Sequence, residues 1–477
     1  MISVTLADED DGAGSAGANI TVNNVAPEID EGDAVTVTGT FSDPALGVLT
    51  ETFSGSATWS DGVATALVVN ADGTFSTARL FLDDDPSTGT PFDLFTVTIE
   101  ISDDDLGSDS EISAALTVHN VDPVIQAFES DATFADKGEE GEPVNVSGDF
   151  TDVGVLDTHS AMVDWGDGTV EALALVQGAG SGTVQGSHAY AAGGLYTITL
   201  TVTDDDTGSH QMSTLAVITG VGLNNGVLYV IGSAEDDTAH IQQTGNGRIK
   251  VHASFIPEPF REFDADQVEQ IISYLCQGDD RLTIAGNVTK PAIVHGDAGD
   301  DHLHGGGGAT VLIGGSGNDT LIGQSGPNIL IGGTGQDRVV GGRGDDLLIG
   351  GSTTFDHNQD AALSSAVLLW TDPLGSYEER AAAVDAFLTV VDDGDADTLT
   401  GSAGEDLFYA GAADVPTDQK ATELEGAALL TIDWTASVWS AGALASRSTP
   451  AAGPGLADFV VLAGQSKSRG QAASGSG

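Results

Sequence analysis

The sequence predicts an all-β fold in which β-sandwich domains precede a parallel β-roll with a short helical insertion. Two kinds of internal repeat predict it. Long strands of alternating apolar and small polar residues, each ending in an acidic cluster, begin at residues 2, 95 and 196. Farther along, residues 296–349 divide without a gap into nonapeptides rich in glycine. The long strands recur at roughly the length of one β-sandwich domain, and nonapeptide repeats are typical of stacked short strands.

The charge of the chain excludes several classes of partner. Lys and Arg number 14 against 73 Asp and Glu, so the formal net charge is −59. This balance argues against a basic face for nucleic acid or an anionic membrane, and it favours metal cations. No stretch approaches the ~20 apolar residues that cross a bilayer, so we expect no membrane span. Because 40% of the residues are hydrophobic, the chain can still build cores.

The start of the chain and its one cysteine bear on context and stability. The first residues carry no basic region and no long apolar run, so we interpret them as the end of a domain rather than as a signal peptide. We therefore expect the sequence to be the C-terminal part of a longer protein. Cys276 is the only cysteine, which excludes an intramolecular disulfide and favours a small buried residue.

The first 220 residues divide into a terminal hairpin of a truncated domain at 1–25 and two β-sandwiches at 26–120 and 121–220. In the second sandwich Tyr196, Ile198, Leu200 and Val202 alternate with threonines. This period of two is typical of a half-buried strand, so these four side chains are expected to face the core.

Three motifs of the segment 121–220 carry a family resemblance. FTDVG begins at residue 150, VDWGDGTVEA at 163 and GSHAYAAGG at 186. The set resembles the PKD (polycystic-kidney-disease-type) domain, and this resemblance implies an immunoglobulin-like sandwich. The segment 26–120 has WSDG at 59–62 and lacks an H-x-Y motif, so it is interpreted as a divergent copy.

Two features of the sandwiches have more than one interpretation. Trp165 stands beside a tight Asp-Gly turn, and we interpret it as a core residue rather than as a platform for a sugar. Aspartates at 103–105 and 204–206 follow strand ends near the domain junctions. We interpret these runs as solvated loops, with calcium sites between domains as the alternative.

Residues 221–295 form short β-like runs separated by acidic turns, and they predict a degenerate lead-in to the roll. One short helix is expected at 265–275.

The nonapeptides that follow at 296–351 have the pattern G-G-x-G-x-D-x-U-x, in which U is a large apolar residue. Position eight is always apolar, and its residues are Leu303, Leu312, Leu321, Leu330, Val339 and Leu348. The pattern resembles the hemolysin-type (RTX) calcium-binding repeat, which implies a calcium-dependent β-roll.

The residue types of the repeat suit calcium. Glycine in the turn permits left-handed backbone angles and lets carbonyl oxygens converge. Aspartate at position six adds a hard anionic oxygen, and calcium takes six to eight oxygens. The candidate metal residues are the turn glycines Gly296, Gly299, Gly314, Gly315, Gly317, Gly332, Gly333 and Gly335 and the position-six residues Asp301, Asp319, Asp337, Asn328 and Asp346. Because such a roll has a thin core, bound calcium is expected to supply much of its stability.

The two edges of the roll are expected to differ. Two nonapeptides make one coil, so Asp301, Asp319 and Asp337 stack on one edge. Thr310, Asn328 and Asp346 stack on the other. We therefore expect two firm calcium sites on the first edge and at most one weak site on the second.

His295, His302 and His304 are interpreted as exposed residues of the roll, with a transition-metal site as the alternative.

The repeat stops for an insertion at 352–391. Ser376 and Glu379 form a capping box for a helix from Tyr377 to about Val391. Its expected buried stripe is Ala383, Ala386, Phe387 and Val390. Further repeats and a cap at 392–440 contain Asp397 and Asp406 as additional candidate ligands. Residues 441–477 are rich in Ala, Gly and Ser and predict a flexible tail.

No catalytic motif is recognised in the sequence. It contains no H-E-x-x-H, G-x-S-x-G or P-loop motif and no second cysteine, so we predict no enzyme. Two functions stay open. The chain is either an extracellular structural or adhesive surface module, with a cell-surface or matrix polysaccharide or protein as partner, or the secretion and folding appendage of an enzyme encoded upstream. The RTX resemblance implies type I secretion in both cases.

Overall fold

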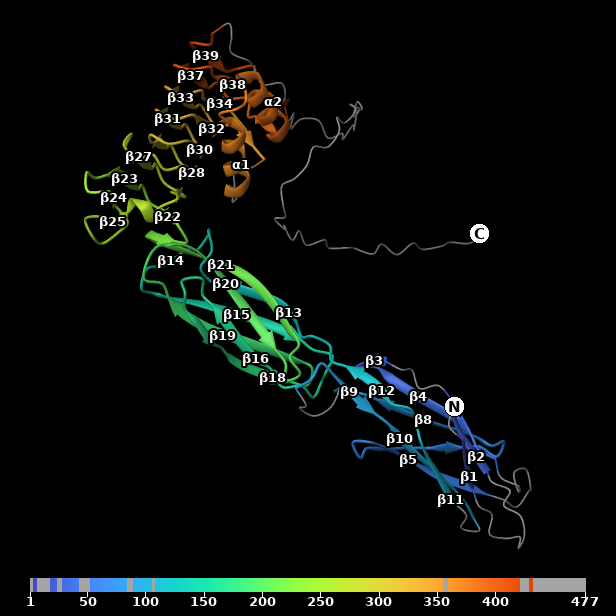
Figure 1. Cartoon of the computed structure of the whole chain (residues 1–477). Helices are drawn as coiled ribbons and strands as arrows, with labels where there is room; N and C mark the ends of the chain where they lie inside the picture. The colour runs from blue at the N-terminus through green and yellow to red at the C-terminus, as the bar shows by residue number, and fades with distance from the viewer. Residues whose placement is uncertain are drawn as a thin grey trace, which may run out of the picture. The chain divides into compact units, whose positions relative to one another are not determined.

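The computed structural model describes residues 3–6, 18–23, 28–42, 52–83, 89–104, 108–354, 359–420 and 429–431, with the backbone alone at 3–6, 18–23 and 429–431. The chain divides into two units, residues 1–432 and residues 433–477. The second unit, which contains the predicted tail at 441–477, lies outside the described residues. The description below concerns the first unit (Figure 1).

The first sandwich packs aromatic residues between its sheets. Its strands are β3 (Glu28–Asp30), β4 (Ala34–Thr40), β5 (Phe53–Trp59), β6 (Ala64–Thr65), β7 (Val68–Val69), β8 (Thr74–Leu80), β9 (Phe92–Phe95), β10 (Val97–Asp103), β11 (Ser108–Ile112) and β12 (Leu116–His119). Trp59, Phe81 and Phe95 meet edge to face, with ring centroids 5.4 Å and 4.9 Å apart. Ahead of these strands, β1 (Ser3–Leu6) pairs antiparallel with β2 (Ala18–Asn23), and β2 pairs antiparallel with β4, so this hairpin extends a sheet of the first sandwich.

The second sandwich confirms the predicted alternation. Its strands are β13 (Val124–Ser130), β14 (Gly138–Glu139), β15 (Pro143–Thr151), β16 (Ser160–Asp164), β17 (Val170–Ala172), β18 (Ala174–Gly178), β19 (Ser181–Ala189), β20 (Gly194–Thr203) and β21 (Ser209–Asn224). Along β20 the buried residues are Tyr196, Ile198, Leu200 and Val202. Trp165 is fully buried and donates from Nε1 to Glu171 Oε1 at 2.8 Å. Its interpretation as a core residue is therefore confirmed.

One strand links this sandwich to the roll. β21 has 16 residues, of which the first part pairs with β20 and the last part pairs with β22 (Val227–Ile231). The boundary expected at 220 therefore lies inside a continuous strand.

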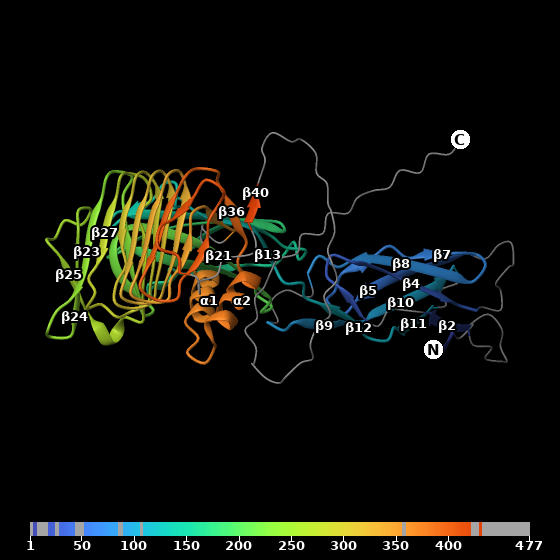
Figure 2. The same ribbon diagram turned by 90° about the horizontal axis from the view of Figure 1, so that it is seen from above.

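The roll consists of two sheets that enclose one apolar core (Figure 2). One sheet contains β22, β26 (Gln270–Tyr274), β28 (Ala292–Ala298), β30 (Thr310–Ser316), β32 (Asn328–Thr334), β34 (Leu347–Ile349) and β38 (Leu407–Tyr409). The other contains β25 (Arg261–Asp264), β24 (Arg248–Ala253), β23 (Thr238–Gln243), β27 (Arg281–Ile284), β29 (His302–His304), β31 (Thr320–Gln324), β33 (Arg338–Gly342), β37 (Thr398–Ser402) and β39 (Val415–Pro416). The strands of both sheets pair in parallel except for β23 with β24 and β24 with β25, which pair antiparallel. All six position-eight residues are 0% exposed in the core between the sheets.

The lead-in at 221–295 supplies the first coils of this roll, because β26 pairs in parallel with β28 and β27 pairs in parallel with β29. The helix expected at 265–275 is wrong. Only a 3₁₀ turn forms there, at Ala265–Gln267, and the chain then enters β26. Ile271 is fully buried in the roll core, so tertiary pairing overrides the local helical tendency.

The insertion contains two helices where the sequence predicted one. α1 (Asp360–Trp370) was not predicted, and α2 (Tyr377–Phe387) ends earlier than expected because the chain enters β36 (Val390–Asp392). β36 pairs with β35 (Ser352–Thr353) and β40 (Leu429–Thr431). The capping box is confirmed, since Glu379 N donates to Ser376 Oγ and Ser376 N donates to Glu379 Oε2.

The predicted stripe of α2 is confirmed only in part. Val390 is fully buried but lies in β36, Ala383 and Phe387 are half-buried, and Ala386 is exposed. The buried face is instead Tyr377, Ala381 and Val384. Together with α1 this face covers the outside of the sheet that contains β30, β32 and β34, as Figure 2 shows. The buried side is therefore set by the sheet beneath the helix rather than by the helix's own pattern.

Two further expectations concern single features. Cys276 is 7% exposed, so its interpretation as a buried residue is confirmed. Among the described residues, neither helix has the length and apolar character needed to cross a membrane.

Candidate calcium sites of the roll

Alternate turns stack on the same edge, as predicted from two nonapeptides per coil. The residues of β30 pair with those exactly one coil later in β32, for example Thr310 with Asn328. The same shift of one coil joins β29 to β31 and β31 to β33. Position-six residues of alternate repeats therefore lie next to one another.

A ladder of aspartates follows the first edge. The backbone N–H of Asp301 donates to Oδ1 of Asp319 at 2.7 Å, and that of Asp319 donates to Oδ1 of Asp337 at 2.8 Å. The ladder is longer than the sequence predicted. Each further step again joins a backbone N–H to the Oδ1 of the next coil, in the order Asp280 to Asp301, Asp337 to Asp397, and Asp397 to Asp414.

The second oxygen of these carboxylates is the feature that points to a metal. In the ladder residues Asp280, Asp301, Asp319, Asp337 and Asp397, Oδ2 is buried and has no hydrogen-bond partner. Each of these residues is at most 3% exposed. Burying an ionised carboxylate without a partner is costly unless a cation or a proton compensates it. A row of hard anionic oxygens with no donor facing them fits calcium.

The glycines leave room beside these oxygens. A Cβ on Gly314 would lie 2.2 Å from Asp319 Oδ2 and 2.4 Å from the carbonyl oxygen of Gly332. The same arrangement recurs at Gly296 and at Gly332 with their own aspartates. Carboxylate and carbonyl oxygens thus converge on space that any side chain at position one would fill.

The other predicted glycines have backbone angles that favour glycine. Gly317 has φ +133°, and a Cβ there would lie 2.1 Å from the carbonyl oxygen of Gly299. Positive φ values are shared by the remaining predicted turn glycines, which are Gly299, Gly315, Gly333 and Gly335. These positions shape the turn in which the carbonyl oxygens lie.

The second edge has fewer carboxylates. Asn328 donates from Nδ2 to Asp346 Oδ1 at 2.8 Å and to the carbonyl oxygen of Gly326, so an amide group stands where the first edge has a free oxygen. Thr310 occupies the turn before it. Asp346, however, donates from its backbone N–H to Oδ1 of Asp406 at 2.9 Å. The edge therefore contains one pair of carboxylates, and the sequence did not reveal it because the insertion separates the two residues.

Burial changes the acidity of the ladder. It raises the pKa of Asp301 and Asp337 to about 8, with further contributions from neighbouring carboxylates such as Asp319. The pKa of Asp346 likewise rises to about 8, mainly through burial, and that of Asp319 rises to about 6. Without a cation, burial in the native roll therefore favours the protonated form of these groups more than it is favoured in an exposed carboxyl.

The predicted histidines do not gather at this site. His295 is 0% exposed, so its expected exposure is wrong; it is stacked on Tyr274, and its Nε2 lies 2.9 Å from Asp360 Oδ1 of α1. His302 and His304 are half-buried on β29, and burial lowers the pKa of both. In the described part of the chain, no candidate metal group contains a histidine. Helix α1, which the sequence analysis did not predict, explains why His295 is buried.

Three ladder residues were missed by the sequence analysis. Asp237 extends the first edge by one coil, because its backbone N–H donates to Asp280 Oδ1 at 2.7 Å. Asp280 stands in GDDRLTI, which resembles half of a repeat, and this signal was available. Asp414 stands in GAADVP, where little of the repeat pattern remains.

Parallel sheets, position-six aspartates and glycine turns define this part of the chain as a β-roll of calcium-repeat type joined to β-sandwiches. Family models agree: residues 120–219 match the PKD domain, and residues 293–321, 322–352 and 389–414 match the RTX calcium-binding nonapeptide repeat. The chain thus contains a PKD domain followed by RTX repeats, in the order that the sequence predicted. Both kinds of module are structural and non-catalytic, and both are typical of secreted or surface proteins.

No curated protein matches the chain. Among solved structures, an ICAM-5 ectodomain fragment is 11% identical, with 52% of this chain and 67% of that chain covered and a TM-score of 0.25. A tandem pair of titin Ig domains is 8% identical, with 42% and 95% covered and a TM-score of 0.21. Fibronectin(III)-like modules of Clostridium thermocellum CbhA are 12% identical, with 42% and 93% covered and a TM-score of 0.17.

Proposed function

We propose that the chain is an extracellular, calcium-binding structural and adhesive module whose roll folds when calcium binds. The observation that supports it best is the aspartate ladder, in which buried Oδ2 atoms have no hydrogen-bond partner. Calcium would be held by these carboxylates together with the carbonyl oxygens of the glycine turns. Bound there, it would compensate a row of buried negative charges.

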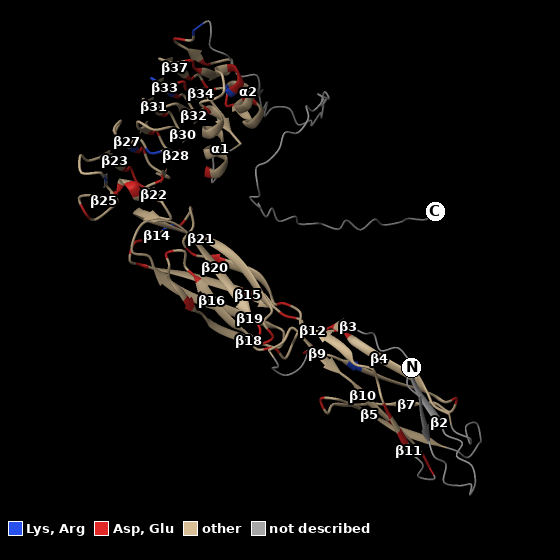
Figure 3. Ribbon diagram, in the orientation of Figure 1, with Lys and Arg blue, Asp and Glu red and all other residues tan. Residues whose placement is uncertain are grey.

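Folding on calcium follows from the charge of the chain. The net charge of −59 makes the chain repel itself, and Figure 3 shows acidic segments far outnumbering basic ones along the described chain. Each nonapeptide contributes a single side chain, such as Leu312 or Leu321, to the core between the sheets, so apolar burial offers limited compensation. A ligand that binds the native state alone stabilises it, and calcium outside cells is available at about the millimolar range.

The adhesive part of the proposal concerns the whole chain. The sandwiches would act as a stalk and the roll as a rigid end that holds a cell-surface or matrix polysaccharide or protein. Export by a type I route is part of the same proposal, since RTX repeats are typical of secreted proteins.

Calcium binding by paired variants tests the proposal. Asp319→Asn keeps the Oδ1 acceptor for Asp301 but places an amide where Oδ2 stands. Asp300→Asn changes an exposed carboxylate at position five of the first repeat, one coil before Asn318, and serves as the matched control. Equilibrium dialysis of the full chain with calcium should show fewer bound ions for Asp319→Asn and an unchanged number for Asp300→Asn, with magnesium a poor competitor. Equal numbers in both variants would contradict the proposal.

A further inference from the structure

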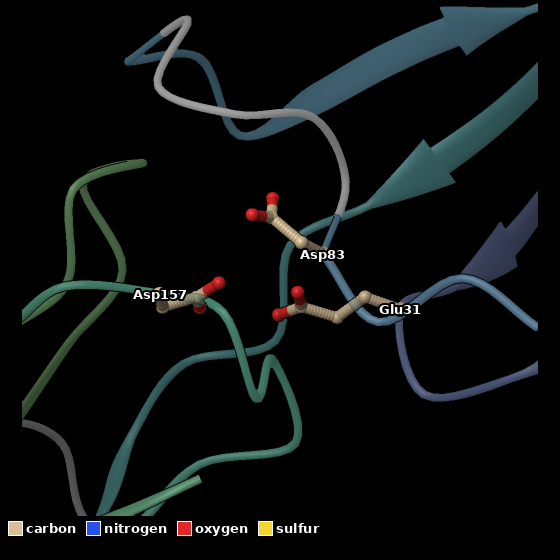
Figure 4. A group of neighbouring side chains, drawn as sticks. All are labelled: Glu31, Asp83 and Asp157. Atoms are coloured by element: carbon tan, nitrogen blue, oxygen red, sulfur yellow. The ribbon is translucent and has the colours of Figure 1, made fainter. Parts of the chain in front are cut away.

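A second group of carboxylates lies where the two sandwiches meet. Glu31 stands in the turn between β3 and β4, Asp83 follows β8, and Asp157 lies in the loop between β15 and β16. Figure 4 shows the carboxylates of Glu31 and Asp157 pointing toward each other from two different domains, with Asp83 beside them. One oxygen from each lies within 4.8 Å of the others. This group is separate from the ladder of the roll.

Asp157 is the residue that points to a ligand. It is 7% exposed, and both of its carboxylate oxygens are buried without a hydrogen-bond partner. Its neighbour Glu31 is 2% exposed and accepts a hydrogen bond from the backbone N–H of Val121 at 2.7 Å. A carboxylate buried in this way needs a compensating cation or proton.

Two glycines bring the backbone of the two sandwiches close to the group. A Cβ on Gly154 would lie 2.2 Å from Asp157 Oδ2 and 2.4 Å from Glu31 Oε2. A Cβ on Gly32 would lie 2.1 Å from Cγ1 of Val153. The turn of the first sandwich and the loop of the second therefore pack directly against each other, with glycines at the closest points.

The neighbouring acids enlarge the negative charge but already have partners. Asp152 lies 2.8 Å from His159 Nε2, and Asp204 accepts hydrogen bonds from Asn120 Nδ2 and from backbone N–H groups. Burial, followed by the charges of Glu31, Asp152, Asp83 and Asp204, raises the pKa of Asp157 to about 8. Because Asp204 and Asp206 are 7% and 1% exposed, the interpretation of the 204–206 run as a solvated loop is wrong for both.

We propose that Glu31, Asp83 and Asp157 bind one calcium ion that joins the two sandwiches. All three donors are carboxylate oxygens, which suit a hard cation and the irregular geometry that calcium tolerates. The nearby histidine is engaged by Asp152, so the donor set is not that of a transition metal. With ligands from both domains, the ion holds the first sandwich against the second.

Hydrogen–deuterium exchange on the full chain shows where calcium slows the exchange of backbone amides. Amides at 152–158 and 119–122 are compared in about 1 mM calcium chloride and in EDTA, and the roll peptides at 296–349 are followed in the same experiment. We expect calcium to slow exchange of the junction peptides in the wild type. Asp157→Asn and Glu31→Gln should each abolish this slowing and leave the roll peptides unchanged, while the exposed control Asp149→Asn should retain it.

The outcomes separate this site from the roll. Junction peptides that exchange equally in calcium and EDTA overturn the proposal even where the roll responds to calcium. If Asp157→Asn alone loses the calcium-dependent protection and Glu31→Gln keeps it, the proposal that both domains share the site is wrong. Loss of the calcium-dependent protection in both variants supports the shared site. Because the two substitutions lie in different domains, misfolding of a single domain does not explain this result.

Discussion

The backbone N–H of Asp337 donates a 2.8 Å hydrogen bond to Oδ1 of Asp397, although 60 residues separate the two in the sequence. Strand β33 likewise pairs in parallel with β37. The insertion is therefore looped out from a roll whose coils stack without interruption. Asp397 continues the first edge and Asp406 the second, so both serve the same ladders as the uninterrupted repeats.

The two edges differ in the number of carboxylate pairs that a single substitution removes. Asp319→Ala breaks the pairs with Asp301 and Asp337, whereas Asp346→Ala breaks the pair with Asp406 and the mixed contact with Asn328. Each change also removes one acceptor of a backbone N–H, worth roughly 1–3 kcal/mol when buried. We expect native mass spectrometry in calcium to show two ions lost for Asp319→Ala and one for Asp346→Ala. An equal loss would show that carbonyl oxygens dominate binding.

Stability of the roll in chelator should fall as the pH rises. The ladder groups have native pKa values of about 6 to 8, above the unfolded value of 3.8. A carboxyl whose pKa is raised in the native state stabilises fully below the unfolded pKa and loses this contribution as the pH rises through the native pKa. Circular dichroism in EDTA should therefore show more β-structure at pH 5 than at pH 8. More β-structure at pH 8 than at pH 5 would contradict the claim that the ladder carboxylates are buried without a cation in EDTA.

The helices of the insertion should stabilise the roll through their buried face. Trp370 is fully buried and donates from Nε1 to the carbonyl oxygen of Asp345 at 2.7 Å, whereas Leu368 of the same helix is 72% exposed. Trp370→Ala should lower the free energy of unfolding of the roll by roughly 3–5 kcal/mol in calcium, and Leu368→Ala should lower it by less than about 0.5 kcal/mol. Urea denaturation measures both, and similar values would place the helices off the sheet.

The core of the second sandwich should be independent of metal. Trp165→Ala removes a fully buried ring and should cost roughly 3–5 kcal/mol, in EDTA and in calcium alike. Val176→Ala, at a side chain that is 74% exposed, is the control. A cost of Trp165→Ala that appears only in calcium would mean that this core depends on the ion.

Much of this architecture could be predicted because its periods are short and strict. Position eight is apolar in each of the six nonapeptides, and the alternation along β20 has a period of two. Both patterns follow directly from strand geometry. The edge assignment of Asp301, Asp319 and Asp337 depended on the coil length alone, and the structure places these residues as expected.

The parts that could not be predicted depend on contacts between distant segments. Ile271 lies in a strand because neighbouring coils extend the sheet there, and His295 is buried because α1 covers it. One signal was overlooked: positions seven and nine of the even repeats are apolar, as at Val311 and Ile313, which indicates an outer face that something covers. The junction group of Glu31 and Asp157 needed two domains in contact, and no local pattern contains it.

Far-UV circular dichroism of the full chain, titrated with calcium after treatment with EDTA, tests the central claim most directly. The account predicts that β-structure from the roll is lost in EDTA and returns at roughly 0.1–1 mM calcium, that magnesium at the same concentration does not restore it, and that the sandwiches contribute β-structure throughout. Identical spectra in EDTA and in calcium would contradict the claim that the aspartate ladder requires calcium to fold.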